Sequence, residues 1–250
     1  MTEKTNKNNV YEFPSRVDGR SLTQMRRILI AAGISPYSAG SSEVVLGSTR
    51  VLTGTSINPN TEAGDACSLR ARVQMLPHAL SIAGEDPLVK EALAKQLGKV
   101  ENLILKAIDA AIPKHVLNGL QITTDCSIVC SDSGVATAAI AGAWVSLFQA
   151  LRLLVQQGDL PTDLHMVQVA AISASVVEGR CLVDPSAEEA SKSEFTCKFI
   201  FDAEQKLIDL QAGRETKACD LTIFQNLIPS ISQQAELIFK EQKRAVSELR

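Results

Sequence analysis

The first third of the chain contains short runs in which apolar and polar positions alternate, a pattern typical of half-buried β-strands. Glycines separate these runs, and short β-rich runs between glycine turns predict an antiparallel meander. The tightest connection is at residues 47–49, where a glycine followed by two hydroxyl residues predicts a hairpin. The strands predicted in this region are residues 28–32, 42–46 and 50–57.

A fourth strand is predicted at residues 68–76, where Leu, Ala, Val and Met alternate with polar residues. Its polar side carries Arg70 and Arg72, and two arginines on one strand face can hold phosphate groups. A solvated strand face is the more frequent explanation of the same pattern.

At residues 86–112 the apolar residues no longer alternate with polar ones but recur at helical spacing, which predicts an amphipathic helix. Lys95 and Lys99 lie one turn apart on the same face and can reach a common anion. An exposed helix surface that binds nothing is the simpler explanation of the two lysines.

The rest of the chain combines strands with long helices. A β run at residues 120–130 precedes a helix at 135–157 that is apolar on almost every side and should be buried against a sheet. Near the N-terminus, a charged turn at 16–20 leads to a short segment at 21–27 that Ser21 is placed to cap. The remaining predicted elements are strands at 167–177, 194–201 and 206–211 and a helix at 221–249.

The composition is that of an ordinary soluble protein. The chain has 250 residues, 45% hydrophobic and 21% charged, which suits one large domain or two small lobes. With 25 basic and 28 acidic residues the net charge is -3, so RNA contact needs a local basic patch or a multi-chain assembly. The most apolar stretch contains Arg152, and residues 1–9 lack an apolar core, so we predict an intracellular protein with no membrane partner.

The candidate chemistry lies between Arg180 and Glu189, where a short apolar run ends at Pro185 and acidic residues follow closely. If Asp184 and Glu189 converge on a cleft, they can hold a divalent cation or act as an acid–base pair. The alternative is a proline-terminated strand and a solvated helix N-terminus, where Glu188 and Glu189 complement the helix dipole. The sequence has no phosphate loop, dinucleotide fingerprint, serine nucleophile elbow or Cys/His zinc pattern, and we predict no cofactor.

Several stretches form a series of short motifs along the chain. The turn Arg-Val-Asp-Gly-Arg at residues 16–20 is followed by a glycine–serine strand and glycine turn at 40–52. Met75-Leu76-Pro77 follows the fourth predicted strand, and a strand at 122–126 is followed by a turn and buried helix at 132–143. Each motif is weak alone, but in this joint order they specifically resemble the RNase PH family, which includes bacterial phosphorolytic exoribonucleases and the ring subunits of the RNA exosome.

The resemblance implies an α+β protein with the RNase PH-type fold (ribosomal S5 domain 2-like), built from two mixed β-sheet/helix lobes. The resemblance runs from about Arg16 to the C-terminus and implies a single RNase PH-like domain at residues 16–250. Because the first residues are rich in Lys, Asn and Thr, we predict a flexible N-terminal arm at residues 1–15. The first lobe would span about residues 16–165 and the second about 166–250. Such domains associate into a six-membered ring, which the pattern of apolar residues does not itself predict.

In active family members, an arginine in a Gly-Arg segment holds phosphate, and a pair of acids after the later strand supports catalysis. Here Gly98-Lys99 stands at the Gly-Arg position, and lysine cannot make the bidentate contact of arginine. When Ala187-Glu188 is matched to the family's Ala-Glu, Val183 and Pro185 occupy acid positions and Asp184 falls one residue out of phase. The resemblance therefore implies an inactive chain with no catalytic or metal-binding residues, because charge stabilisation supplies much of such a reaction's acceleration.

The leading hypothesis is a non-catalytic RNase PH-like subunit of the eukaryotic RNA exosome ring, acting as a scaffold in 3′–5′ RNA processing and degradation. The implied partners are other RNase PH-like subunits, cap proteins with RNA-binding folds, a separate catalytic nuclease and RNA. The implied locations are the nucleus, nucleolus and cytoplasm. The candidate RNA contacts are Arg70, Arg72, Lys95 and Lys99.

Two alternatives stay open. The first is an active phosphate-dependent 3′–5′ exoribonuclease, in which Asp184 and Glu189 bind the metal and Lys99 holds phosphate. The second is a stand-alone RNA-binding or scaffold protein that never enters a ring. Release of nucleoside diphosphates from RNA would favour the active enzyme over the non-catalytic subunit. Co-purification with five similar subunits would favour the ring subunit over the stand-alone protein.

Overall fold

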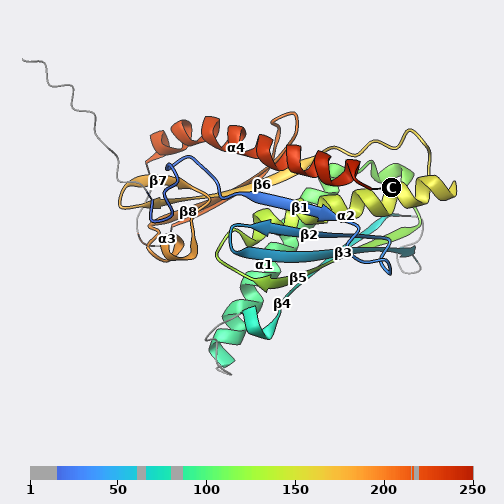
Figure 1. Cartoon of the computed structure of the whole chain (residues 1–250), viewed down its shortest axis with the longest axis horizontal. Helices are drawn as coiled ribbons and strands as arrows, with labels where there is room; N and C mark the ends of the chain where they lie inside the picture. Colours follow the sequence, from blue (N-terminus) through green and yellow to red (C-terminus); the bar gives the residue numbers. More distant parts are fainter. Residues whose placement is uncertain (1–15, 61–65, 80–86, 215, 217–219, 250) are drawn as a thin grey trace, which may run out of the picture.

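The structure of the chain, a computed structural model, is shown in Figure 1. It describes residues 16–60, 66–79, 87–214, 216 and 220–249. The N-terminal arm predicted at residues 1–15 lies outside the described residues. The predicted division into two lobes near residue 165 stays a prediction.

The first sheet has five strands: β1 (Ile28–Ala32), β2 (Gly40–Leu46), β3 (Thr49–Pro59), β4 (Ser68–Met75) and β5 (Leu120–Cys130). Their order is β1-β2-β3-β5-β4, and all neighbours are antiparallel except β4 and β5, which are parallel. The predicted meander of β1, β2 and β3 is confirmed. The hairpin between β2 and β3 turns at Gly47, whose φ of 58° lies in the left-handed region that glycine adopts without strain.

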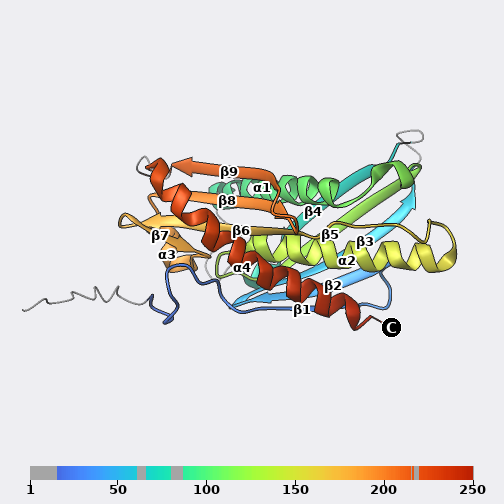
Figure 2. The ribbon, with the colours of Figure 1, turned by 90° about the horizontal axis from the view of Figure 1, so that it is seen from above.

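The second sheet has four strands: β6 (Val169–Val177), β7 (Arg180–Val183), β8 (Phe195–Asp202) and β9 (Leu207–Arg214). Their order is β7-β6-β8-β9, and every neighbouring pair is antiparallel. All four strands follow the first sheet in the sequence, so the two sheets are separate in the chain as well as in space (Figure 2).

The helices are α1 (Pro87–Ala111), α2 (Val135–Gln157), α3 (Ala187–Ser191) and α4 (Leu221–Ser247), with short 3-10 turns at Pro77–Ala79 and Lys114–Val116. Helix α2 contacts β2 and β3 of the first sheet and β6 of the second. Helix α4 crosses the second sheet diagonally and reaches β1, as Figure 2 shows. The predicted α+β fold, with mixed sheet and helix lobes, is confirmed.

Helix α2 forms the centre of the core, as its apolar sequence predicted. It is buried along most of its length from Ala136 to Leu151. Its small residues allow close packing: Ser42 Oγ on β2 donates a hydrogen bond to Gly142 O on α2 at 2.9 Å. Among the described helices α2 is the one with the length and apolar composition of a membrane span, but 67% of that stretch is buried inside the protein, and a core helix meets the same criteria.

The N-terminal connector, which we define as residues 16–27, is where the sequence prediction is wrong. The segment at 21–27 that Ser21 was expected to cap contains turns and extended chain instead of a helix. Leu22 O accepts a hydrogen bond from Val183 N at 2.8 Å, so the connector runs beside the outer edge of β7 before it enters β1. Backbone groups that bond to β7 cannot also bond within a helix, and this tertiary contact outweighs the local capping signal.

Candidate functional site

A cleft of about 530 Å³ opens between the N-terminal half of α1, the start of α2 and one face of the second sheet. Lys99 of α1 and Lys198 of β8 lie in its wall, and within the described residues no Asp or Glu lines it. Hydroxyl groups come from Ser131, Ser133, Ser173, Ser175 and Thr196. Two ammonium groups and several hydroxyls suit an anionic ligand, whereas a divalent cation requires carboxylate or carbonyl oxygen ligands.

The N-terminal end of helix α2 lies in the wall of the cleft. Gly134 precedes the helix with a φ of 70°, and no side chain caps the helix there. Gly134, Val135 and Ala136 all line the cleft. Free N–H groups at a helix N-terminus carry partial positive charge, which adds to that of the two lysines. A side chain at Gly134 would not fit, because its Cβ would lie 2.7 Å from Arg26 Nη2.

The acidic segment that follows β7 belongs to a buried ion network beside the cleft. Asp184 directly follows the strand, is 2% exposed and has a φ of 49°. Its carboxylate accepts hydrogen bonds from Arg26: Nη2 donates to Oδ1 at 2.6 Å, and Nε and the backbone N each donate to Oδ2 at 2.8 Å. Burial alone would lower the pKa of Arg26, but the hydrogen bond and charge of Asp184 raise it.

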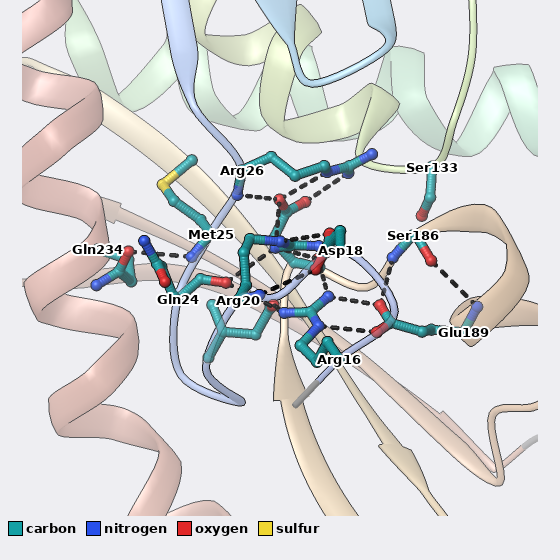
Figure 3. A network of polar contacts seen from close by, with 12 residues as sticks. Arg16, Asp18, Arg20, Gln24, Met25, Arg26, Ser133, Ser186, Glu189 and Gln234 are labelled. Atoms are coloured by element: carbon teal, nitrogen blue, oxygen red, sulfur yellow. Dashed lines mark hydrogen bonds and ion pairs between the residues drawn. The ribbon is translucent and has the colours of Figure 1, made fainter. Parts of the chain in front are cut away.

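Two further arginines of the N-terminal connector bind the backbone at the end of β7, and Figure 3 shows them converging with Arg26. Arg16 Nη1 donates to Val183 O, and Arg16 Nη2 donates to Asp184 O, each at 2.8 Å. Arg20 Nη1 donates to Asp184 O at 3.1 Å and lies 3.5 Å from Asp184 Oδ2. Three cations therefore surround one buried carboxylate and the carbonyl groups next to it.

Glu189 closes the same network from α3. Arg16 Nε donates to Glu189 Oε1 at 2.8 Å, and Ser186 N donates to Glu189 Oε2 at 2.8 Å in a capping box. Partial burial acts to raise the pKa of Glu189, but the hydrogen bonds from Arg16 and from the Ser186 backbone lower it below its usual range. The predicted solvated helix start holds for Glu188, which pairs with exposed Lys192, but is wrong for Glu189.

Neither acid therefore lies where the metal-site interpretation needs it. The carboxylates of Asp184 and Glu189 are bound by arginines, and neither residue lines the cleft. Among the described residues, no group of three or more His, Cys, Asp or Glu side chains could hold a metal ion. Val183 is fully buried, and Pro185 is the residue of this segment that reaches the cleft wall.

The structure separates the candidate RNA contacts. Lys99 lines the cleft, and Lys95 is exposed one turn away on α1. Arg70 and Arg72 are exposed on β4, and Arg72 lies 3.7 Å from Asp125. Because Met75 of the same strand lines the cleft, strand alternation places both arginines on the opposite side of β4.

Lys198 and three of the four connector arginines, those at 16, 20 and 26, were missed as site residues by sequence reasoning. Lys198 lies in an alternating strand, where a lysine has no local mark of a cleft. The sequence contains one indication of the arginines at 16, 20 and 26, which is the excess of positive charge in a segment of 11 residues. That segment was interpreted as a charged turn followed by a capped segment. Only the folded chain shows that this charge is matched by Asp184 and Glu189.

The chain is similar to proteins of known family. Residues 24–152 match the sequence profile of the 3′ exoribonuclease family, domain 1 (RNase PH). Ribonuclease PH of Maricaulis maris (strain MCS10) is 35% identical over 217 residues, which is 84% of this chain and 90% of that protein. Ribonuclease PH of Caulobacter vibrioides (strain NA1000 / CB15N) is 31% identical over 239 residues, 92% of this chain and 99% of that protein.

Solved structures share the fold at lower identity. A chain of the Archaeoglobus fulgidus exosome with RNA bound to the active site superposes with a TM-score of 0.77 at 20% identity, covering 91% of this chain and 92% of that one. Rice (Oryza sativa) Rrp46 superposes with a TM-score of 0.72 at 16% identity, covering 92% of this chain and all of that one. At these identities the likeness concerns the fold.

Proposed function

The chain belongs to the RNase PH family of 3′ exoribonucleases, and from this premise we propose that it is a non-catalytic subunit of a eukaryotic RNA exosome ring. Its role is to complete the ring and support 3′–5′ RNA processing and degradation. One observation carries the proposal: among the described residues, no carboxylate lines the cleft, because Asp184 and Glu189 bind arginines of the connector.

The chemistry of the cleft supports this proposal. In phosphorolysis an oxygen of inorganic phosphate attacks the 3′-terminal phosphodiester of RNA, the bond to the 3′ oxygen of the preceding nucleotide breaks, and a nucleoside diphosphate leaves. The enzyme must stabilise the negative charge of that transition state. Lys99 presents one point charge where a guanidinium would present a planar fork. At the acid positions, Val183 is buried and Pro185 contributes only apolar surface. Within the part of the chain that the structure describes, the cleft can attract an anion but has no carboxylate that would hold a metal beside it.

The proposed partners follow from the family and the fold. Two of the solved structures with this fold are described as an archaeal exosome with bound RNA and as an archaeal exosome core. We propose a six-membered ring of RNase PH-like chains, with cap proteins of RNA-binding fold on one side and a separate nuclease that cuts the RNA. The proposed locations are the nucleus, nucleolus and cytoplasm.

An active phosphate-dependent exoribonuclease is the second candidate. It is favoured by one finding: the bacterial relatives are ribonucleases PH and align over 84% and 92% of this chain. In that case Lys99, with the first turn of α2, would hold the phosphate.

A phosphorolysis assay separates these two functions. The chain, shown to be folded and placed with RNA, magnesium and inorganic phosphate, is expected to release no nucleoside diphosphate above background. The Lys99→Ala variant is the matched control, because it removes the cleft lysine from α1. Robust release that falls in the Lys99→Ala variant would overturn the non-catalytic assignment.

The RNA contacts are tested by charge reversal in the assembled complex. Lys95→Glu with Lys99→Glu is expected to weaken RNA binding and to reduce the slope of log K against log salt by about 1 for each phosphate that is no longer bound. Arg70→Glu with Arg72→Glu, on the other side of β4, is expected to leave both quantities unchanged. If reversal at all four positions changes neither, this chain does not contribute to the RNA path.

A further inference from the structure

The two walls of the cleft belong to different parts of the chain. One wall contains the turn between β5 and α2, where Ser131, Ser133 and Gly134 line the cleft. The other wall is a face of the second sheet, together with Pro185 and Ala190 from the segment that follows β7. Both walls carry hydroxyl groups. An anion that contacts both is bound well only when the distance between them is fixed before it arrives.

Asp132 lies in the β5–α2 turn between two residues of the cleft but does not itself line the cleft. Its carboxylate bonds to the other wall: Ala187 N, at the first position of α3, donates to Asp132 Oδ1 at 2.9 Å. Figure 3 shows the two segments together, with Ser133 of the turn beside Ser186 at the start of α3. Ala190 of the same short helix lines the cleft, so this hydrogen bond connects the two walls.

The turn that carries Asp132 is attached to the first sheet and to the connector. Asp132 N donates to Thr49 Oγ1 at 2.8 Å, and Thr49 Oγ1 donates to Ser133 O at 2.6 Å. Arg26 Nη1 donates to the backbone oxygen of Asp132 and lies 3.3 Å from its Oδ2. Thr49 is fully buried, so a shift of the turn would disturb the first sheet. The turn is therefore a fixed point against which α3 is held.

We propose that Asp132 is a positioning residue for the anion-attracting cleft. It acts through Ala187: its carboxylate holds the start of α3, and with it the second wall, at a set distance from the turn before α2. The proposal rests on the anion-attracting cleft of the proposed function, but it holds whether or not the chain degrades RNA. A phosphorolysis assay and a phosphate titration therefore fail independently of each other.

The charge of Asp132 and its hydrogen bond act on a bound anion in opposite directions. A carboxylate beside the cleft repels an anion, so loss of the charge alone strengthens phosphate binding. Loss of the hydrogen bond releases α3 from the turn, and the anion then has to order the two walls as it binds. Asp132→Asn and Asp132→Ala both remove the charge, but asparagine keeps an oxygen that can accept from Ala187 N. The difference between the two variants isolates the hydrogen bond.

Titration of the full chain with inorganic phosphate, followed by NMR through the amide signals of Ser133 and Gly134, measures the affinity. We expect Asp132→Asn to bind phosphate at least as tightly as the unmodified chain. Asp132→Ala is expected to bind it about three- to tenfold more weakly than Asp132→Asn does. Equal affinities in the two variants would overturn the proposal, because the charge alone would then account for both. An unmodified chain whose signals do not respond to phosphate would overturn it as well.

Ala187→Pro tests the same hydrogen bond from its donor side. Proline removes the N–H group and leaves the charge of Asp132 in place, and it is tolerated at the first position of a helix. Phosphate binding is expected to weaken about three- to tenfold relative to the unmodified chain. This variant decides the question if Asp132→Ala does not fold. A folded Ala187→Pro chain with unchanged phosphate affinity would reject the proposal.

Asp125→Ala is the matched control for the loss of a carboxylate. Asp125 lies on β5, its side chain is 52% exposed, and its partner Arg72 is 3.7 Å away on β4, on the side of the strand opposite the cleft. Its phosphate affinity is expected to equal that of the unmodified chain. If Asp125→Ala weakens phosphate binding as much as Asp132→Ala does, the effect does not come from the contact with α3 and the proposal fails.

Discussion

The Asp184→Asn variant is expected to lose about 3–5 kcal/mol of unfolding free energy, the range seen when one partner of a buried ion pair is removed. Asparagine keeps the shape of the side chain but removes the charge that faces Arg26 and Arg20. Both arginines are at least 90% buried and would keep their positive charge, with only the more exposed Asp18 beside Arg20 and Asp132 beside Arg26 to offset it. Chemical denaturation followed by tryptophan fluorescence measures the loss, because Trp144 lies in the central helix α2.

Glu188→Gln is the matched control for the same segment. Its side chain is 61% exposed and pairs with Lys192 one helical turn away, and solvent strongly screens exposed pairs of this kind. A loss far smaller than that of Asp184→Asn is therefore expected. Equal losses in the two variants would show that the arginines do not depend on Asp184. Their positions would then have to be maintained by the carbonyl groups of Val183 and Asp184 alone.

The difference in stability between Asp184→Asn and Glu188→Gln bears on function, because an acidic residue near a cleft can be either catalytic or structural. A carboxylate used in catalysis is commonly exposed to ligand and costs little stability when it is replaced, whereas Asp184 is 2% exposed and binds two arginines of the connector at the end of β7. Through Arg16, Arg20 and Arg26 it joins the connector to β7, and Asp132 links Arg26 to the start of α3. We therefore interpret the acidic segment as structural.

The elements with strong local patterns were predicted from the sequence almost to the residue. The strand at 120–130 and the helix at 135–157 have the bounds that the structure gives them. Both are long, strongly periodic and separated by a glycine turn, which are conditions in which local preference and tertiary packing agree. Helix α1 was predicted one residue too long at its C-terminal end, and residue 86, where the predicted helix begins, lies outside the described residues.

The ion network could not be predicted in the same way. Arg26 and Asp184 are 158 positions apart, and Arg16 and Glu189 are 173 apart. No periodicity links residues at such distances, so the sequence left Asp184 as either a metal ligand or the end of a strand. The same limit applies to the cleft, where Lys99 and Lys198 are brought together by the packing of α1 against the second sheet.

The Gly40→Ala variant is expected to lose at least about 3 kcal/mol or to fail to fold, because overpacking against backbone leaves no side chain free to move aside. A Cβ at Gly40 would overlap the carbonyl oxygen of Ser146 and lie 2.8 Å from Ala150 N, both on α2. To admit it, α2 would have to move away from β2. That movement would break the hydrogen bond between Ser42 Oγ and Gly142 O along the same helix–sheet contact.

Gly54→Ala separates this steric effect from the general effect of replacing glycine. Gly54 lies in β3 of the same sheet, and a Cβ there would meet no atom within 4 Å. Alanine restricts the unfolded chain, so a gain of about 0.4–1 kcal/mol is expected, with the opposite sign to Gly40→Ala. Chemical denaturation measures the unfolding free energy of both variants. Since the two substitutions add the same methyl group, equal effects would mean that α2 does not approach β2 as closely as the Gly40 contact requires.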